Sequence, residues 1–147
     1  MSQANPTPVP ATAALPQGAH FIRVIEDASA PAAPPKLDAE KLICYDLALE
    51  LQALCATLVP ANHRVLQDQL ERASLSVVCN IAEGAGRRSR KDKRRFYTMA
   101  RGSATESAAI VDVLRLRQLA PERACATARS YALRIVQLLT KLDAALS

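Results

Sequence analysis

The sequence predicts an all-α protein, an up-down-up-down four-helix bundle preceded by a disordered segment rich in proline and alanine. Half of the 147 residues are apolar, yet only 3% are aromatic and none is tryptophan, so Leu, Val, Ile and Ala must build the core. Leu and Ala are strong helix formers, whereas β-branched runs are scarce. From residue 38 onward, apolar residues recur every three or four positions, as they do on one face of an amphipathic helix.

The N-terminal segment contains seven of the nine prolines of the chain, all before residue 36. It has no apolar period and cannot bury enough surface to offset the entropy lost on ordering. We therefore predict that residues 1–36 are disordered and that residues 37–147 form the bundle domain. Within the leader, Phe21–Ile25 is apolar enough to dock on a partner or on the domain, with an inert tail as the alternative.

Residues that typically start or end a helix mark the boundaries of the first two helices. Pro60 ends the first helix and Asn62 can cap the second. The second ends at Gly84 or Gly86, either of which can take the left-handed conformation that often terminates a helix. The expected inward residues are Ile43, Leu47, Leu51, Leu54 and Leu58 in the first helix, and Leu66, Leu70, Ala73, Val77 and Ile81 in the second.

Two further helices complete the pattern. Ser89 is a plausible N-cap of the third helix, and Asp92 can complete a capping box with it. Pro121 suits the first turn of the fourth helix. Short connections make neighbouring helices antiparallel, which gives the bundle. The expected inward residues are Phe96, Met99, Ala100, Ser103, Ser107, Ile110 and Leu114 in the third helix, and Tyr131, Ile135, Leu138 and Leu142 in the fourth.

The small inward residues of the two middle helices favour close approach of their backbones. Ala73, Ala100, Ser103 and Ser107 are consistent with tight packing inside one bundle or with a contact between subunits. The sequence leaves both open.

The cysteines show no spacing typical of a metal site or a redox pair. We expect all four to be reduced and mostly buried, and we expect no metal and no cofactor. No stretch approaches the roughly 18 apolar residues that span a bilayer, and the N-terminus lacks the pattern of a secretory signal. These features favour the cytoplasm and no membrane partner. The cysteines are Cys44, Cys55, Cys79 and Cys125.

Positive charge is concentrated in one short segment, from Arg87 to Arg101. It contains eight basic residues and one acid, a net charge of +7, whereas the whole chain carries +5. A local excess of this kind points to a polyanionic partner, because the field is strongest where contacts can form. The predicted nucleic-acid-binding residues are Arg87, Arg88, Arg90, Lys91, Arg94, Arg95 and Arg101.

Helical geometry predicts which groups of this segment face a ligand. Arg90, Arg94 and Arg101 fall within about 40° of one another on the third helix. The turn before that helix offers unpaired N–H groups and the positive end of the helix dipole, which together with an arginine can hold a phosphate oxygen. Since Tyr97 is the one aromatic side chain expected beside the arginines, binding should be largely blind to base sequence.

Asn80 and Glu83 lie near the end of the second helix. Asn80 is expected to be half-buried and to need a hydrogen-bond partner. We predict that Asn80 or Glu83 bonds to the third helix, with Arg101 as the candidate partner, and so fixes the register of the helix hairpin. Ordinary exposure of Glu83 is the alternative.

A longer ordered motif surrounds the basic segment. "RASLSVVCNIAEGAGRRSRKDKRRFYTMARGSATESAAIVDVL", from Arg72 to Leu114, resembles the signature of the small bacterial four-helix-bundle proteins also called 23S rRNA-intervening sequence proteins. The resemblance covers everything after the leader. Its matching elements are Asn80 to Gly84, Gly86-Arg87, Arg95-Phe96 and Ala100 to Ser103, and the motif residues that we single out are Asn80, Glu83, Gly84, Gly86, Ser89 and Asp92.

The resemblance has implications for assembly and partners. Relatives are thought to assemble as homopentamers, which implies a basic homo-oligomer here. The related accessory protein of diversity-generating retroelements is similar in fold and basic, and it binds nucleic acid and a reverse transcriptase, which likewise implies a ring-like basic oligomer. Nothing in this sequence ties it to a retroelement.

No catalytic constellation stands out. His20 falls in the leader, His63 lies next to Arg64, and Asp68 and Glu71 suit an exposed helix face. The function predicted first is non-enzymatic, non-specific binding of an RNA or DNA backbone by a homo-oligomer. The alternatives are a protein-interaction scaffold or accessory subunit for an acidic partner or a nucleic-acid enzyme such as a reverse transcriptase, plain solvation of the basic face and, last, a nuclease.

Overall fold

The computed structural model describes residues 33–147. The predicted features of the leader up to residue 32, including Phe21–Ile25 and His20, lie outside the described residues. A short 3-10 helix, η1 (Asp38–Lys41), precedes four α-helices. These are α1 (Ile43–Leu58), α2 (Arg64–Gly86), α3 (Arg90–Leu116) and α4 (Glu122–Ala145).

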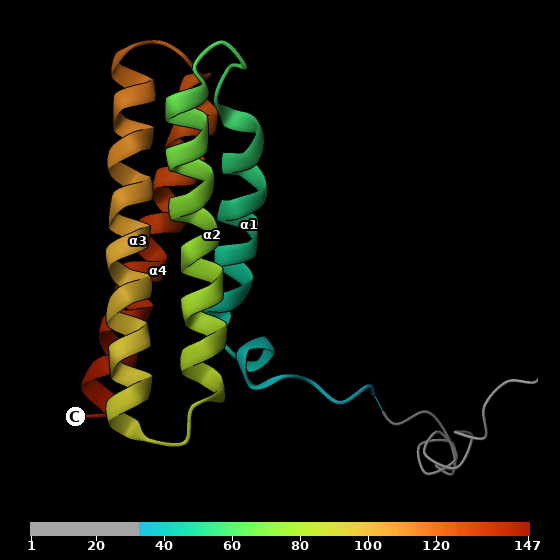
Figure 1. The fold of residues 1–147 in the computed structure, drawn as a ribbon, viewed down its shortest axis with the longest axis vertical. Coiled ribbons are helices and arrows are strands. Elements are labelled where there is room, and N and C mark those ends of the chain that lie inside the picture. The colour runs from blue at the N-terminus through green and yellow to red at the C-terminus, as the bar shows by residue number, and fades with distance from the viewer. Residues whose placement is uncertain (1–32) are drawn as a thin grey trace, which may run out of the picture. The chain divides into compact units, whose positions relative to one another are not determined.

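The four helices run alternately up and down, and each packs against two neighbours (Figure 1). α2 lies between α1 and α3, and α4 closes the bundle by contacting both α3 and α1. The turn between α2 and α3 therefore lies at the same end as the C-terminus of α4 (Figure 1). The predicted up-down-up-down four-helix bundle is confirmed, and residues 33–147 contain no strand.

Small and aliphatic side chains form the core, as the composition predicted. Alanines and cysteines occupy many of the central positions, which lets the helix backbones lie close together. Each large aliphatic residue removed from water adds about 1.5–3 kcal/mol to folding. The largest aliphatic side chains with at most 1% exposure are Leu51, Leu70, Val77, Ile81, Val111, Leu114, Ile135 and Leu139.

The observed inward faces of α1 and α3 differ from the predicted ones. Met99, predicted to be inward, is 46% exposed, while Tyr97, predicted to lie beside the arginines, is only 4% exposed. Ile43, also predicted to be inward, is 68% exposed, and its neighbour Cys44 is buried instead. On α1 the small Cys44 takes the inward place, whereas on α3 Gly84 of the neighbouring helix leaves room for the larger Tyr97 ring.

The predicted stops and starts are partly correct. α1 ends at Leu58, just before Pro60, as expected. The N-cap of α2 is His63 rather than Asn62, and its side chain makes no capping bond. Pro121 is the N-cap of α4, one residue earlier than predicted.

The predicted left-handed glycine at the end of α2 is wrong. No glycine in residues 33–147 has a positive φ, and both Gly84 and Gly86 belong to the helix itself. α2 ends instead with Arg87 in an extended conformation, whose N–H donates to the carbonyl oxygen of Gly84 at 3.2 Å.

All four cysteines are free, and Cys44, Cys55 and Cys125 are buried while Cys79 is exposed. This confirms the prediction of reduced, mostly buried thiols. Burial raises the pKa of both the Cys44 and Cys55 thiols to about 11.

Candidate nucleic-acid interface

The basic residues predicted to bind nucleic acid surround the turn between α2 and α3. We call this set the basic hairpin; it consists of Arg87, Arg88, Arg90, Lys91, Arg94, Arg95 and Arg101. The turn itself spans residues 87–89, and α3 starts directly after it. Ser89 caps α3 as predicted, because its Oγ accepts a hydrogen bond from the Asp92 N–H at 3.4 Å. Within the described chain, no return bond from the Ser89 N–H to the Asp92 carboxylate completes a capping box.

A glycine lets the two arms of the hairpin approach closely. A Cβ added at Gly84 would stand 2.7 Å from Tyr97 Cε1 and 3.1 Å from Phe96 Cβ, closer than side chains normally pack. Gly84 therefore leaves room for the buried Tyr97 ring. Burial also raises the pKa of the Tyr97 hydroxyl and keeps its ring from stacking on a base.

Lys93 links the start of α3 to the end of α2. Its Nζ donates to the carbonyl oxygen of Ala85 at 2.7 Å. Carbonyl groups in the last turn of a helix lack partners within the helix, so a lysine on the next helix can satisfy one. Sequence reasoning counted this lysine only as charge, although its position opposite the end of α2 was the available signal.

Arg87 is folded back onto the hairpin. Its Nη2 pairs with the Glu83 carboxylate one turn earlier, and its guanidinium lies 5.0 Å from the centroid of the Phe96 ring. Both side chains of the ion pair remain about half exposed. Glu83 therefore bonds within the end of α2 rather than to α3.

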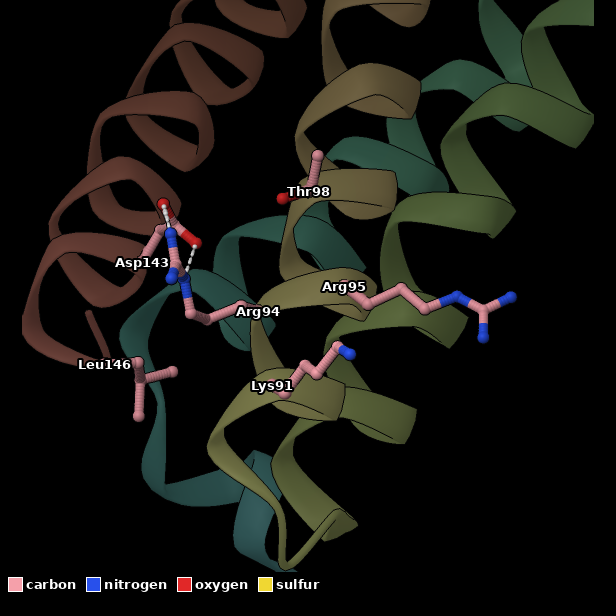
Figure 2. Close-up of a pocket in the computed structure, with 6 residues that line it drawn as sticks. All are labelled: Lys91, Arg94, Arg95, Thr98, Asp143 and Leu146. Carbon is pink, nitrogen blue, oxygen red and sulfur yellow. Dashed lines mark hydrogen bonds and ion pairs between the residues drawn. The ribbon is translucent and has the colours of Figure 1, made fainter.

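Arg94 crosses from α3 to α4. Its Nε and Nη2 donate to the two oxygens of Asp143 at 2.9 and 3.4 Å (Figure 2). The hydrogen bond and charge of Arg94 lower the pKa of the Asp143 carboxyl, and the carboxylate in turn raises the pKa of Arg94. This pair joins the basic hairpin to the C-terminal end of the bundle.

The predicted bond between Asn80 or Glu83 and Arg101 is wrong. Asn80 Nδ2 donates to the carbonyl oxygen and hydroxyl of Ser76 at 2.8 and 3.0 Å. The Ser76 hydroxyl in turn shares a 2.9 Å hydrogen bond with Ser103 on α3. Arg101 instead donates to Thr140 Oγ1 on α4 at 3.4 Å.

Four exposed cations of the basic hairpin have no ion-pair partner among the described residues. Within residues 33–147, none of them has a carboxylate within 4.0 Å. Segment 87–101 taken together with Glu83 and Asp143, the two acids that pair with it, still carries a net charge of +5. These cations are Arg88, Arg90, Lys91 and Arg95.

Two of these four cations, Lys91 and Arg95, border a common surface depression. Lys91, Arg94, Arg95 and Thr98 line a depression of about 410 Å³ that reaches Asp143. Figure 2 shows Arg94 directed at Asp143, while Arg95 points away from α4. Arg94 and Arg101 both reach α4, where they donate to Asp143 and Thr140, so these two arginines already have partners within the bundle.

The sequence of the chain matches a known protein family. The family described as 23S rRNA-intervening sequence protein matches residues 40–141, which include the hairpin and nearly all of the four helices. The chain belongs to the 23S rRNA-intervening sequence protein family. A search of curated proteins found no match.

In residues 33–147, no group of three or more His, Cys, Asp or Glu side chains lies close enough together to hold a metal ion. No helix in that part of the chain is both long and apolar enough to cross a membrane.

Proposed function

We propose that this intervening-sequence family protein binds the phosphate backbone of RNA or DNA through the basic hairpin, without catalysing a reaction. The observation that carries the proposal is the exposure of Arg88, Arg90, Lys91 and Arg95 with no carboxylate partner among the described residues. A cation that already has a partner must give it up to bind a phosphate, whereas these four do not.

The buried position of Tyr97 supports binding without base specificity. Phosphate contacts position a nucleic acid, whereas base contacts read its sequence. Phe96 is half-buried and covered by the Arg87 guanidinium, so neither aromatic ring of the hairpin is free to stack on a base. Affinity should therefore depend on charge and length of the nucleic acid rather than on its sequence.

Salt dependence tests the proposal. The logarithm of affinity for duplex DNA should fall linearly with the logarithm of salt concentration, by about 0.9 per phosphate neutralised. A variant with Arg88→Gln, Arg90→Gln, Lys91→Gln and Arg95→Gln should lose much of that slope, while Arg72→Gln on α2 should leave it unchanged. Binding that is absent, or indifferent to salt, would contradict the proposal.

We further propose that the protein acts as a homo-oligomer, which agrees with the pentamer implied by the sequence resemblance. Five of the nine large apolar side chains that are most exposed in residues 33–147 lie on α2 and α3. Large contiguous apolar patches mark protein contacts, and we propose that these side chains contribute to such a patch between subunits. The five are Val65, Leu75, Met99, Val113 and Leu116, with exposures from 42% to 86%.

Light scattering tests the assembly. A particle several times the 15.8 kDa of one chain is expected. Val113→Glu on α3 should reduce its size, because it introduces a charge into the proposed contact. Leu49→Glu on α1 is a matched control, since the two residues are 42% and 45% exposed. A monomer at micromolar concentration would contradict the proposal.

A further inference from the structure

The outer face of α4 carries a continuous row of exposed polar side chains. At about 100° per residue, all of them fall within about 40° of one line along the helix, opposite the buried residues Ala132 and Leu139. Three are cations and none is an acid. We call this set the α4 basic row; it consists of Arg123, Thr127, Ser130, Arg134, Gln137 and Lys141.

The other charges of α4 are paired with α3. Arg115 binds Glu122 at 3.5 Å, and Arg94 binds Asp143 at 2.9 Å, so both acids of α4 have partners. The remaining arginine, Arg129, binds Asp112 at 3.0 Å. In the described part of the chain, the charges of α4 left without an ion-pair partner are the three cations of the row.

A solvated helix face normally mixes charges of both signs, which pair at spacings of three or four residues. The α4 basic row does not follow this pattern. The outer side of α1 carries negative charge instead. Its charged residues are the acids Asp46 and Glu50, both exposed. Positive charge is therefore concentrated on one side of the bundle as well as at one end.

The chemistry of the row fits a phosphate backbone better than an acidic protein. Arginine, lysine, serine, threonine and glutamine side chains all donate hydrogen bonds to phosphate oxygens. A stable protein interface needs an apolar or aromatic centre, and the row itself contains no apolar residue. Leu133 is 53% exposed but lies about 80° away from the line of the row around the helix axis.

We propose that the α4 basic row is a second contact surface for the nucleic-acid backbone. This inference rests on the proposed function and adds a helix that the basic hairpin does not include. The 18-residue separation of Arg123 and Lys141 corresponds to about 27 Å along the helix, or the length of about eight base pairs. The row ends near the hairpin, since Asp143 lies two residues beyond Lys141 and binds Arg94.

The test compares two groups of variants on one duplex of roughly 24 base pairs, about three times the length of the row. Fluorescence anisotropy gives the affinity over a range of salt concentrations. Combining Arg123→Gln, Arg134→Gln and Lys141→Gln should lower the salt slope by about 0.9 per lost contact, and adding the hairpin substitutions should lower it further. Arg72→Gln is the control, and circular dichroism verifies that each variant is helical.

The outcomes separate this inference from the proposed function. If the α4 variant keeps the wild-type slope and affinity while the hairpin variant loses both, the row is not a contact surface and the proposed function stands. If the wild-type protein does not bind the duplex, both are overturned. Polyglutamate that competes more strongly than the duplex at equal charge would assign the row to an acidic protein and overturn the inference.

Discussion

Tyr97 of α3 packs directly against the backbone of Gly84 on α2. A Cβ at position 84 would lie 2.7 Å from Tyr97 Cε1 and 2.9 Å from its Cδ1. The ring is 4% exposed and belongs to the core, so it cannot turn outward without leaving a cavity. The closeness of α2 and α3 next to the basic hairpin therefore depends on the absence of a side chain at this position.

Gly84→Ala should destabilise the protein by about 1–3 kcal/mol, because the added methyl group overpacks a filled site. Gly102→Ala provides the matched control. Gly102 is also helical, but a Cβ there would meet nothing within 4 Å. Its substitution should stabilise α3 by up to about 1 kcal/mol through helix propensity. Equal unfolding free energies for the two variants in denaturant would contradict the steric role of Gly84.

The hydrogen bond between Ser76 and Ser103 should couple α2 to α3. Removing either hydroxyl costs about 0.5–1.5 kcal/mol for a bond of this kind, and the double variant should cost less than the sum. A double-mutant cycle of Ser76→Ala and Ser103→Ala measures this coupling. Additive effects would show that the 2.9 Å contact contributes nothing to the register of the hairpin.

The helices could be predicted well from the sequence, because apolar periodicity and the residues that start or end a helix are local signals. Pro60 and Ser89 act through their own backbone neighbourhood, so their effects can be predicted without the rest of the chain. The inward face of α3 could not be predicted in the same way. Whether Tyr97 or Met99 lies inside depends on the space left by Gly84, which belongs to another helix.

The partners of charged residues were equally beyond sequence reasoning. Arg94 and Asp143 are 49 residues apart, and only the closure of the bundle brings them together. The prediction identified where positive charge is concentrated but not which cations are already paired. It also missed the α4 basic row, whose signal was the spacing of Arg123, Arg134 and Lys141 on one helical face.

Thiol labelling should distinguish the cysteines by burial. A thiolate is the reactive form, and the pKa of about 11 for Cys44 and Cys55 keeps both thiols protonated at pH 8. Cys125 is buried as well, whereas Cys79 is exposed. A chromogenic disulfide reagent should therefore modify one thiol in the folded protein and four after unfolding. Labelling of Cys55 at the rate of Cys79 would contradict the packing described.

The ion pair between Arg94 and Asp143 should make stability depend on pH in the acid range. Because the pKa of Asp143 is lowered in the folded state, the pair stabilises the protein above the ordinary carboxyl value of 3.8. That contribution is lost as the pH falls through the lowered folded value. Melting temperatures of the wild type and Asp143→Asn should therefore differ near neutral pH and converge in acid. A difference that grows on acidification would contradict this assignment.

The same substitution should strengthen nucleic-acid binding if Asp143 holds Arg94 away from phosphates. Asp143→Asn removes a negative charge beside Lys91 and Arg95 and releases a guanidinium, so the salt slope should rise by up to about 0.9. Asp112→Asn is the matched control, because it removes the same charge but releases Arg129, which lies outside both the basic hairpin and the α4 basic row. An equal gain in both variants would assign the effect to net charge alone, and weaker binding by Asp143→Asn would show that the pair orients Arg94 for the phosphate.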